Sequence, residues 1–558
     1  MGIGIKKLGN GLKLKMQKDN MYNFKTEPFE HQKIAYHMLR DLDYFAVTAD
    51  MGTGKTKIVI DIAGYKFLET KTINAMMVIA PNGVHTQWVE EQLPIHCNVP
   101  YTAIVWNSAK RTNQKYSREL KSFLTSQTDK LKVFAVNVEA FQSDSIMPIV
   151  GEFVKNHNVF SVVDESTRIK NPKAKRSGII HRLNKYGTRC TLTGTPVAKS
   201  PFDLWSQYEF LKANYFDCNY FIFQHRYGVM MQGVNPMGGR YRTLLDEKMF
   251  NIVKHKIKGM REARNGKLME DDYATIASIL GLSERDIRFI EDQEQFVRYR
   301  NLDNLKQIVS PITFSIRKED CFDLPPKVHQ KVIIDMPREQ RRIYDDLKKN
   351  LLAQYSEEKL TVTNKLSLSI RFMQICGGFF PFSEEIEGLN GSITEVKRYK
   401  PIGVTNEKMR LLSEDIEDTD EPVIVWAVFI PEILALHKQL TKVGRKVGLY
   451  YGAVSQEGRE QVKKQFNDGT IDTFLGNGQT AAYGLNLQIS TMQMFFSNNY
   501  RTEDRLQMED RSHRYGMKGT CRYRDYLYKN TIDEKIYLNF QEGKKMNDFF
   551  TRPLKEIL

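Results

Sequence analysis

The stretch Ala49-Asp50-Met51-Gly52-Thr53-Gly54-Lys55-Thr56 joins an apolar segment, residues 44–48, to a helical pattern over residues 57–67. Its glycines let backbone N–H groups turn toward phosphate oxygens, Lys55 adds a positive charge, and the Thr56 hydroxyl can bind Mg²⁺. The N-terminus of the following helix adds a favourable dipole. Although Ala49 stands where the GxxxxGK[ST] pattern has its first glycine, strand, loop and helix together predict an ATP site at residues 50–56.

A second segment supplies the carboxylates that such a site needs. Asp164 and Glu165 follow the apolar residues Val162 and Val163. Carboxylates at the end of a buried strand are costly unless they bind a metal or perform chemistry. We therefore predict that Asp164 holds Mg²⁺ together with Thr56, and that Glu165 orients and deprotonates the attacking water.

Three further side chains complete the predicted ATP site. Gln32 precedes the loop, and its amide can donate to and accept from an adenine edge, although a surface helix position is the alternative. Arg511 and Arg514 have the spacing of one helix face. Arginine is always charged and planar, so both suit the negative charge that develops during hydrolysis, although exposed helix arginines are common.

Short apolar segments alternate with helical patterns in two parts of the chain, which predicts two parallel sheets covered on both faces. The fold class is therefore α/β, with two lobes and helical insertions. The predicted strands are residues 44–48, 75–80, 133–136 and 160–163, then 423–428, 447–450, 473–475 and 494–496. The predicted domains are a basic N-terminal arm (1–23), an ATP-binding lobe (24–211), a helical insertion (212–310), a second lobe (311–545) with an insertion near 345–405, and a C-terminal tail (546–558).

The charge of the chain indicates a polyanionic partner. Its 82 Lys and Arg exceed its 67 Asp and Glu, which gives a formal net charge of +15. Nucleic acid, an anionic membrane surface, or a generally basic surface would each fit this excess. A basic cluster in the insertion predicts DNA contacts by Lys254, Lys256, Lys258 and Arg261. Residues 273–285 read as a helix, a tight turn and a Ser-capped helix, which is either a DNA-reading pair or an ordinary helical hairpin.

Other classes of protein are disfavoured by the sequence. The six cysteines are scattered without a CxxC pair, which argues against zinc modules and a disulfide framework. No apolar run is long enough to span a bilayer, and the N-terminus lacks the apolar region of a secretion signal. We expect a soluble intracellular protein.

Taken in order, these segments resemble those of superfamily 2 helicase-type ATPases, and within that group the Swi/Snf-type DNA translocases. The resemblance extends from about Phe24 to Phe540. The segments that carry it are 29–32, 49–56, 78–81 with Trp88, 164–171, 192–196 with 202–206, 323–327, 423–429, 451–459, 483–487, 507–516 and 530–535.

The resemblance implies two RecA-like lobes with ATP and Mg²⁺ bound between them, and Gly484 as a further nucleotide-binding residue. It implies a DNA-dependent ATPase that translocates on double-stranded DNA through phosphate contacts, without sequence preference. We expect the protein to be a monomer. The chain is compact for the family and has no evident chromatin-reading module. This favours a viral (phage) or microbial member, located in the host cytoplasm if viral.

Three alternatives remain open at this stage. The first is a helicase that unwinds or branch-migrates forked or four-way DNA in replication, recombination or repair, which a wedge hairpin in the insertion would favour. The second is a P-loop kinase or small-molecule ATPase, which leaves Arg511 and Arg514 unexplained. The third is a non-catalytic DNA-binding module, against which Lys55, Asp164 and Glu165 argue.

Overall fold

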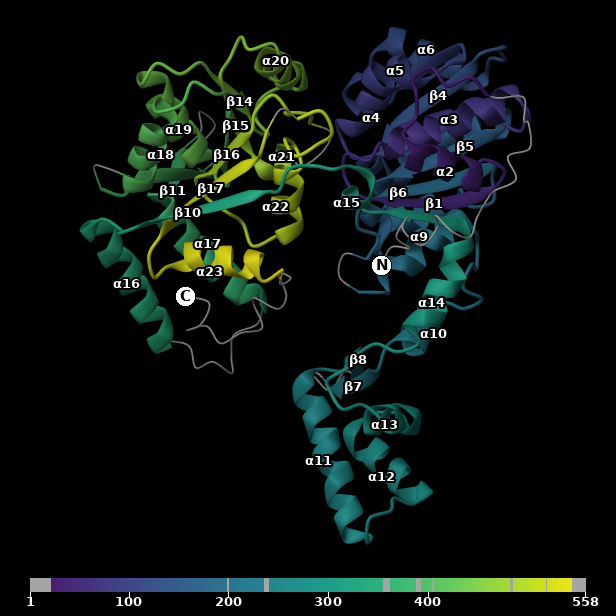
Figure 1. The fold of residues 1–558 in the computed structure, drawn as a ribbon, viewed down its shortest axis with the longest axis vertical. Coiled ribbons are helices and arrows are strands. Elements are labelled where there is room, and N and C mark those ends of the chain that lie inside the picture. The colour runs from purple at the N-terminus through teal and green to yellow at the C-terminus, as the bar shows by residue number, and fades with distance from the viewer. Residues whose placement is uncertain are drawn as a thin grey trace. The chain divides into compact units, whose positions relative to one another are not determined.

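The computed structural model forms two compact units, unit 1 (residues 1–317) and unit 2 (residues 318–558) (Figure 1). It describes residues 22–197, 200–234, 240–354, 362–387, 393–403, 406–481, 485–517 and 519–543. The predicted C-terminal tail and all but the last two residues of the predicted N-terminal arm lie outside these ranges.

Unit 1 contains a seven-stranded parallel sheet in the order β3-β4-β2-β5-β6-β1-β9. Strands β2 and β5 are buried at every position, as expected of strands covered on both faces. The strands are β1 (Tyr44–Ala49), β2 (Ala75–Ala80), β3 (Tyr101–Val105), β4 (Leu131–Asn137), β5 (Val159–Asp164), β6 (Thr188–Thr193) and β9 (Thr313–Ile316).

The helices of this part of unit 1 alternate with the strands along the chain. Such connections keep consecutive strands parallel, so their carboxyl ends meet at one edge of the sheet. The helices are α2 (Glu30–Leu39), α3 (Lys55–Leu68), α4 (Val84–Gln87), α5 (Leu93–His96), α6 (Gln114–Thr125), α7 (Met147–Asn156), α8 (Lys175–His181) and α9 (Asp203–Leu211).

The chain between β6 and β9 includes an insertion with a core of its own. Its helices are α10 (Tyr220–Tyr227), α11 (Glu247–Ala263), α12 (Glu270–Leu280), α13 (Glu284–Glu291) and α14 (Leu302–Val309). Phe250, Val253 and Ile257 of α11 pack against Ile276 of α12 and Ile287 of α13. Ser283 caps α13 through the N–H of Asp286, as predicted. An antiparallel hairpin precedes α11 and consists of β7 (Met230–Val234) and β8 (Arg240–Leu244). The helical pattern of the sequence did not predict this hairpin.

Unit 2 contains a six-stranded parallel sheet in the order β10-β17-β16-β13-β15-β14. Its central strand β13 is buried at every position. The strands are β10 (Val328–Ile334), β13 (Val423–Ala427), β14 (Val447–Tyr450), β15 (Thr473–Asn477), β16 (Met492–Phe495) and β17 (Arg522–Tyr528). The strand predicted at residues 494–496 corresponds to β16, which begins two residues earlier and ends one residue earlier than predicted.

The helices of unit 2 flank this sheet and an antiparallel hairpin formed by β11 (Phe379–Glu387) and β12 (Ile393–Pro401). They are α15 (Lys318–Cys321), α16 (Arg338–Gln354), α17 (Val362–Cys376), α18 (Glu407–Glu417), α19 (Ile430–Lys442), α20 (Gln456–Asn467), α21 (Gly478–Ala481), α22 (Thr502–Glu509) and α23 (Ile532–Gln541). Two parallel-sheet lobes with helical insertions confirm the predicted fold class. Within the described residues, no helix is long and apolar enough to cross a membrane.

Candidate functional site

The glycine-rich loop of unit 1 connects the end of β1 to the start of α3. Gly52 and Gly54 adopt φ values of 82° and 80°, which favour glycine. A Cβ atom on Gly54 would lie 2.1 Å from Nε2 of Gln32, so a side chain there would also clash. Helix α3 begins at Lys55, and its first N–H groups have no partners within the helix. The loop therefore has the geometry of an anion-binding helix start.

The side chain of Lys55 folds back onto the same loop. Its Nζ donates hydrogen bonds to the carbonyl oxygens of Ala49 (2.7 Å) and Asp50 (3.2 Å). The ammonium group is thus held at the carboxyl end of β1. Thr56 follows it in the first turn of α3 and is half-buried.

Gln32 holds the loop against helix α2. Its Oε1 accepts the N–H of Phe29 (2.9 Å), and its Nε2 donates to the carbonyl oxygen of Thr53 (3.2 Å). The ring of His31 contacts the same carbonyl oxygen at 2.8 Å. Both ends of the Gln32 amide are therefore engaged with protein groups, and the structure gives Gln32 a loop-holding position next to Gly54.

Asp164 ends β5 and is buried. Its Oδ2 accepts the indole N–H of Trp88 (2.9 Å), and its Oδ1 accepts the N–H of Glu165 (2.9 Å). Burial raises the pKa of Asp164, an effect opposed by Trp88 and by the charge of Lys55. A cation at this carboxylate would favour the ionised form that burial disfavours.

Three predicted segments lie at one edge of the unit 1 sheet. In the strand register, Asp164 is level with Leu192 of β6, which is level with Val47 of β1. The next pair along is Thr193 with Thr48. Since β5, β6 and β1 are neighbours, the carboxylates, residues 193–196 and the glycine-rich loop all follow the same three strand ends.

Gln207 of α9, which the sequence did not single out, links two of these segments. Its Oε1 accepts the hydroxyl of Ser166 (2.6 Å), directly after the carboxylate pair. Its Nε2 donates to the carbonyl oxygen of Pro196 (2.8 Å) and to that of Asp203 (2.8 Å). A buried amide side chain therefore connects the residues after β5 with the residues after β6.

A cavity of about 430 Å³ lies next to the glycine-rich loop within unit 1. Its wall is mostly apolar, with hydroxyl groups from Thr48, Thr313 and Ser315. The other residues that line it are Asp50, Gly194, Thr195, Pro196, Val197, Pro201, Leu204, Tyr208, Leu302, Leu305, Lys306, Val309, Ser310, Ile316 and Arg317.

The two arginines of unit 2 do not lie on a helix, which corrects the prediction. Helix α22 ends at Glu509, and the chain turns at Asp510, where ψ is 0°. Arg511 is completely buried, and its guanidinium donates to the carbonyl oxygens of Gln507 (2.9 Å) and Leu485 (3.1 Å). We call residues 510–517 the arginine loop.

Arg514 is held by the same loop. Its Nε donates to the carbonyl oxygen of Asp510 (2.8 Å), and burial lowers the pKa of its guanidinium. Because Asp510 turns the chain, helical i, i+3 spacing does not describe how the two arginines are placed. Gly484, the further predicted nucleotide-binding residue, lies outside the described residues.

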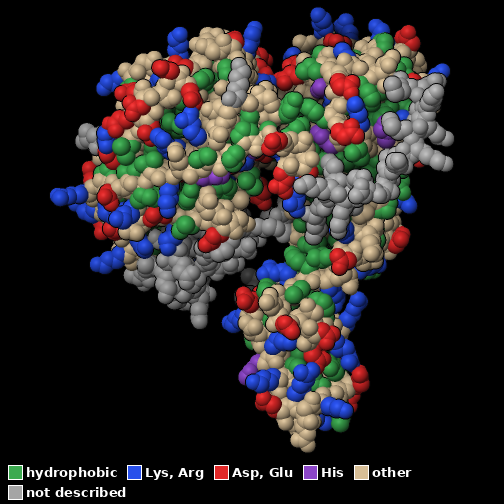
Figure 2. Space-filling view, viewed as in Figure 1, with side chains coloured by type: hydrophobic (Ala, Val, Ile, Leu, Met, Phe, Trp, Pro, Cys, Tyr) green, Lys and Arg blue, Asp and Glu red, His purple; other side chains and the backbone are tan. Residues whose placement is uncertain are grey.

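The predicted DNA-contacting residues of α11 fall into two groups. Lys254 donates to the carbonyl oxygen of Glu291 (3.0 Å), and Arg261 forms an ion pair with the Glu291 carboxylate (2.5 Å). Both therefore tie α11 to α13. Lys256 and Lys258 are exposed, and Lys258 lies 4.0 Å from Glu262. Figure 2 shows basic and acidic side chains interspersed over this insertion.

Comparison with known proteins places the chain in a family. A family model described as "SNF2-related domain" matches residues 47–377, which is more than half of the chain. The chain belongs to the SNF2-related family. A second model, "Helicase conserved C-terminal domain", matches residues 407–516. As an SNF2-related chain, it is classed with the superfamily 2 ATP hydrolases, and the predicted Swi/Snf resemblance is confirmed.

Individual relatives of this SNF2-related chain are distant. It is 22% identical over 499 residues to "Nuclear protein STH1/NPS1" of Saccharomyces cerevisiae, with 87% of this chain and 32% of the yeast protein covered. It is 22% identical to "Putative protein p41" of Acyrthosiphon pisum secondary endosymbiont phage 1, with 96% and 100% covered. The chain spans only about a third of the yeast relative but the full length of the phage protein.

One solved structure is similar along most of the chain. It is described as "Sulfolobus solfataricus SWI2/SNF2 ATPase core in complex with dsDNA". The match covers 96% of this chain and 97% of the other, at 18% identity and a TM-score of 0.36.

Proposed function

We propose that this protein is a DNA-dependent ATPase that translocates on double-stranded DNA. One observation carries the ATPase part: the glycine-rich loop, residues 193–196 and the Asp164–Glu165 pair follow three neighbouring parallel strands in register. The relation to a "SWI2/SNF2 ATPase core in complex with dsDNA" supports DNA as the partner. The SNF2-related and helicase C-terminal segments in one chain support a motor rather than a small-molecule kinase.

In this proposal the residues of unit 1 bind the nucleotide and activate water. The N-terminus of α3 and Lys55 would hold the phosphates of ATP, and Thr56 and Asp164 would hold Mg²⁺, which supplies charge neutralisation at the phosphates. Mg²⁺ usually takes few ligands from the protein and the others from phosphate and water, so two protein ligands suffice in this proposal.

The remaining predicted residues act on the reaction itself. Glu165 orients a water molecule and accepts its proton. Arg511 and Arg514 stabilise the charge that develops on the transferred phosphoryl group, a task for which their permanent charge is suited. DNA contacts go mainly to phosphates, so binding tolerates sequence and weakens with salt.

The decisive experiment measures ATP hydrolysis with no nucleic acid, duplex DNA, single-stranded DNA, forked DNA and RNA. Strong stimulation by plain duplex, absent in Lys55→Ala, is the expected result. Displacement of a third strand from a triplex on the same duplex then separates movement along DNA from simple binding. Stimulation by a small substrate but by no nucleic acid would exclude this function.

The β7–β8 hairpin favours a second candidate, separation or branch migration of DNA strands. This hairpin lies in the insertion and is tied to the α12–α13 turn, because the N–H of Gln232 donates to the carbonyl oxygen of Gly281 (2.9 Å). A hairpin held against a helical support is suited to divide two strands. Preferential stimulation by forked DNA, together with release of a single strand, would select this candidate.

A further inference from the structure

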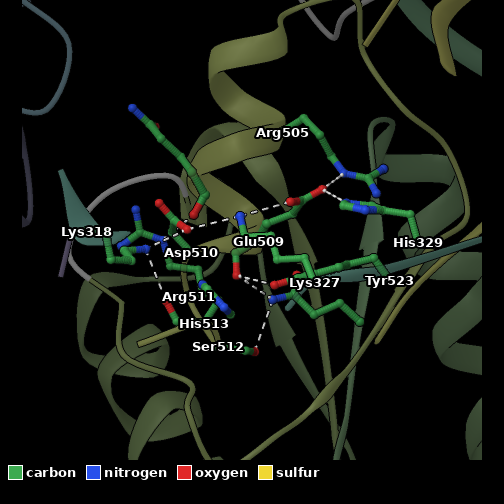
Figure 3. A network of polar contacts seen from close by, with 12 residues as sticks. Lys318, Lys327, His329, Arg505, Glu509, Asp510, Arg511, Ser512, His513 and Tyr523 are labelled. Atoms are coloured by element: carbon green, nitrogen blue, oxygen red, sulfur yellow. Dashed lines mark hydrogen bonds and ion pairs between the residues drawn. The ribbon is translucent and has the colours of Figure 1, made fainter. Parts of the chain in front are cut away.

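The first residues of unit 2 are bound to the arginine loop. Lys318 directly follows Arg317, the last residue of unit 1, and its side chain is only 11% exposed. Its Nζ lies 2.8 Å from Oδ1 of Asp510 and donates to the carbonyl oxygen of His513 at 3.1 Å. Figure 3 shows Lys318 and Asp510 pointing toward each other. We call residues 318–327 the connector segment.

The far end of the connector segment is attached to the same place. Nζ of Lys327 lies 3.1 Å from Oε2 of Glu509 and 3.2 Å from Oδ1 of Asp510. The ring of His513 contacts the carbonyl oxygen of Pro325 at 2.8 Å. The rings of Phe322 and Tyr515 also pack together, with centroids 5.1 Å apart. Both ends and the middle of the connector segment therefore contact residues at or next to the arginine loop.

Glu509, one of the two acidic residues of this network, is also anchored to α22 and to the sheet. Oε1 of Glu509 contacts Nε of Arg505 (3.0 Å) and the ring of His329 on β10 (3.0 Å) (Figure 3). Burial would raise the pKa of Glu509, but His329, Arg505 and Lys327 together lower it to about 2. Since the Glu509 carboxylate is buried and ionised, loss of one of these cations leaves a charge that is not compensated.

Asp510 joins the network to a predicted catalytic arginine. Its carboxylate is held by Lys318 and Lys327, while its backbone carbonyl oxygen accepts Nε of Arg514 at 2.8 Å. A displacement of the connector segment would move the Asp510 backbone, and with it the group that orients the Arg514 side chain. The contact is therefore a direct physical link between the point where the chain leaves unit 1 and the arginine loop.

We propose that Lys318 and Asp510 are positioning residues that couple the connector segment to the placement of Arg514 for ATP hydrolysis. The inference rests on the proposed function, because it assigns a role in that reaction. Neither residue touches ATP in this account. They fix the orientation of the Arg514 side chain and make that orientation depend on the position of the connector segment, which begins directly after Arg317.

The test replaces Lys318 by Met, which keeps length and removes charge, and by Arg, which keeps charge. We expect Lys318→Met to lower kcat with duplex DNA at least about tenfold while KM for ATP changes less than about twofold, because the arginine acts in the transition state. Lys318→Arg should recover most of kcat. Hydrogen exchange of residues 510–517 should be faster in Lys318→Met than in the wild type.

Lys408→Met is the matched control, because Lys408 is also buried in unit 2 but pairs at 2.9 Å with Asp533 of α23 and not with an acidic residue of the connector network. It should lower Tm but leave kcat of the folded protein and exchange at 510–517 unchanged. Wild-type kcat and exchange in Lys318→Met, or equal loss of kcat in both variants, would overturn the proposal. Absence of hydrolysis by the wild type would refute the proposed function instead, and the exchange experiment would still decide whether Lys318 fixes the loop.

Discussion

Glu165 has a backbone conformation that few residues other than glycine adopt, with φ of 50° and ψ of 55°. Such a conformation costs free energy, and the surrounding contacts must maintain it. Here the N–H of Glu165 donates to Asp164, and its carbonyl oxygen accepts the N–H of Arg168 at 2.9 Å. The chain thus turns sharply at the end of β5, and this turn directs the side chain of Glu165 differently from that of Asp164.

This placement supports a prediction about Glu165→Gln. The amide cannot accept a proton from water, so we expect ATP turnover to fall at least about 100-fold, the usual scale of general-base catalysis. Affinities for ATP and duplex DNA should stay within about threefold of the wild type, because the variant keeps shape and loses only the proton acceptor. Turnover and equilibrium binding are measured on the same preparation, with Lys55→Ala as the variant that should also lose nucleotide affinity. Near-normal turnover would remove Glu165 from its assigned role.

Trp88 illustrates what single residues in a sequence do not reveal. The order of segments led to the prediction that Asp164 is a metal ligand, and it stays a prediction. The sequence placed Trp88 only in a segment that resembles one of the family. Nothing in the spacing indicates that its indole N–H reaches Asp164, a residue 76 positions later. That contact depends on β2 and β5 being neighbours, which is a property of the sheet order.

Glu432 in unit 2 gives a pH-dependent prediction. It is buried, its Oε2 accepts the N–H groups of Val428 and Phe429 and the hydroxyl of Ser497, and burial raises its pKa to about 7. Lys408 opposes this rise and Asp533 adds to it. Because the folded pKa exceeds the unfolded value of 4.5, the stability of the protein should fall as pH rises from about 4.5 to about 7 and then level off.

Glu432→Gln removes this ionisation. We expect the variant to resemble the wild type near about pH 5 and to be more stable near about pH 8, by at most about 3 kcal/mol, since one pKa unit corresponds to about 1.4 kcal/mol. Urea unfolding of both proteins at the two pH values measures the difference. Glu417→Gln makes the same substitution at an exposed position of unit 2 and serves as the control. A difference that is equal at both pH values would contradict the assignment.

At the scale of elements, the ends of helices were harder to predict than their existence. The helix before the arginines was expected to continue through Arg514, yet it ends at Glu509. Helical spacing could not reveal this, because the contacts that hold the turn come from Lys318 and Lys327, almost two hundred positions earlier. The α12–α13 pair was predicted correctly because its signals, Gly281 at the turn and Ser283 at the cap, are local.

Gln207 on α9 supports a prediction at this scale, because it joins the segment after β5 to the segment after β6. Gln207→Leu keeps the volume but leaves Ser166 and Pro196 without this partner. We expect basal ATP turnover to change less than about threefold, and its stimulation by duplex DNA to fall at least about fivefold, because the two segments can then move separately. Steady-state turnover with and without DNA provides the measurement.

Two comparisons make the Gln207 experiment specific. Gln207→Glu keeps the acceptor for Ser166 and loses the donor to Pro196, so the two links can be separated. Gln340→Leu removes another buried glutamine, which donates to the carbonyl oxygen of Ile375 in unit 2. It should cost stability of about 1–3 kcal/mol without changing DNA stimulation. Unchanged stimulation in Gln207→Leu would rule out the link as a coupling element.

For the molecule as a whole, the two parallel sheets were predictable because their strands are short, apolar and separated by helices. Every predicted strand of unit 1 is present, but β3, β6 and β9 of its parallel sheet were not among the predicted ranges, and β3 is only partly buried over most of its length. The order of the strands also could not be predicted, since it depends on contacts between distant segments. That order is what brings Asp164 level with the strand before the glycine-rich loop.

The distribution of charge over the molecule leads to the last prediction. The chain carries +15, yet residues 246–300, the part of the insertion that contains α11, α12 and α13, hold 11 Lys and Arg and 11 Asp and Glu, so this segment is neutral overall. Its basic residues are concentrated on α11, where Lys256 and Lys258 are exposed while Lys254 and Arg261 contact Glu291. We therefore expect only the first pair to bind DNA phosphates, and the second pair to hold α11 on α13.

In Lys256→Ala/Lys258→Ala, the slope of log binding constant against log salt should decrease in magnitude by up to about 1.8, since each phosphate contact contributes about 0.9. Lys254→Ala/Arg261→Ala should lower Tm and leave the slope unchanged. Fluorescence anisotropy on one duplex across a salt series, with Tm for each variant, measures both quantities. The opposite pattern would reassign the DNA contacts to Lys254 and Arg261, and an unchanged slope in both variants would place the DNA-binding surface elsewhere on the chain.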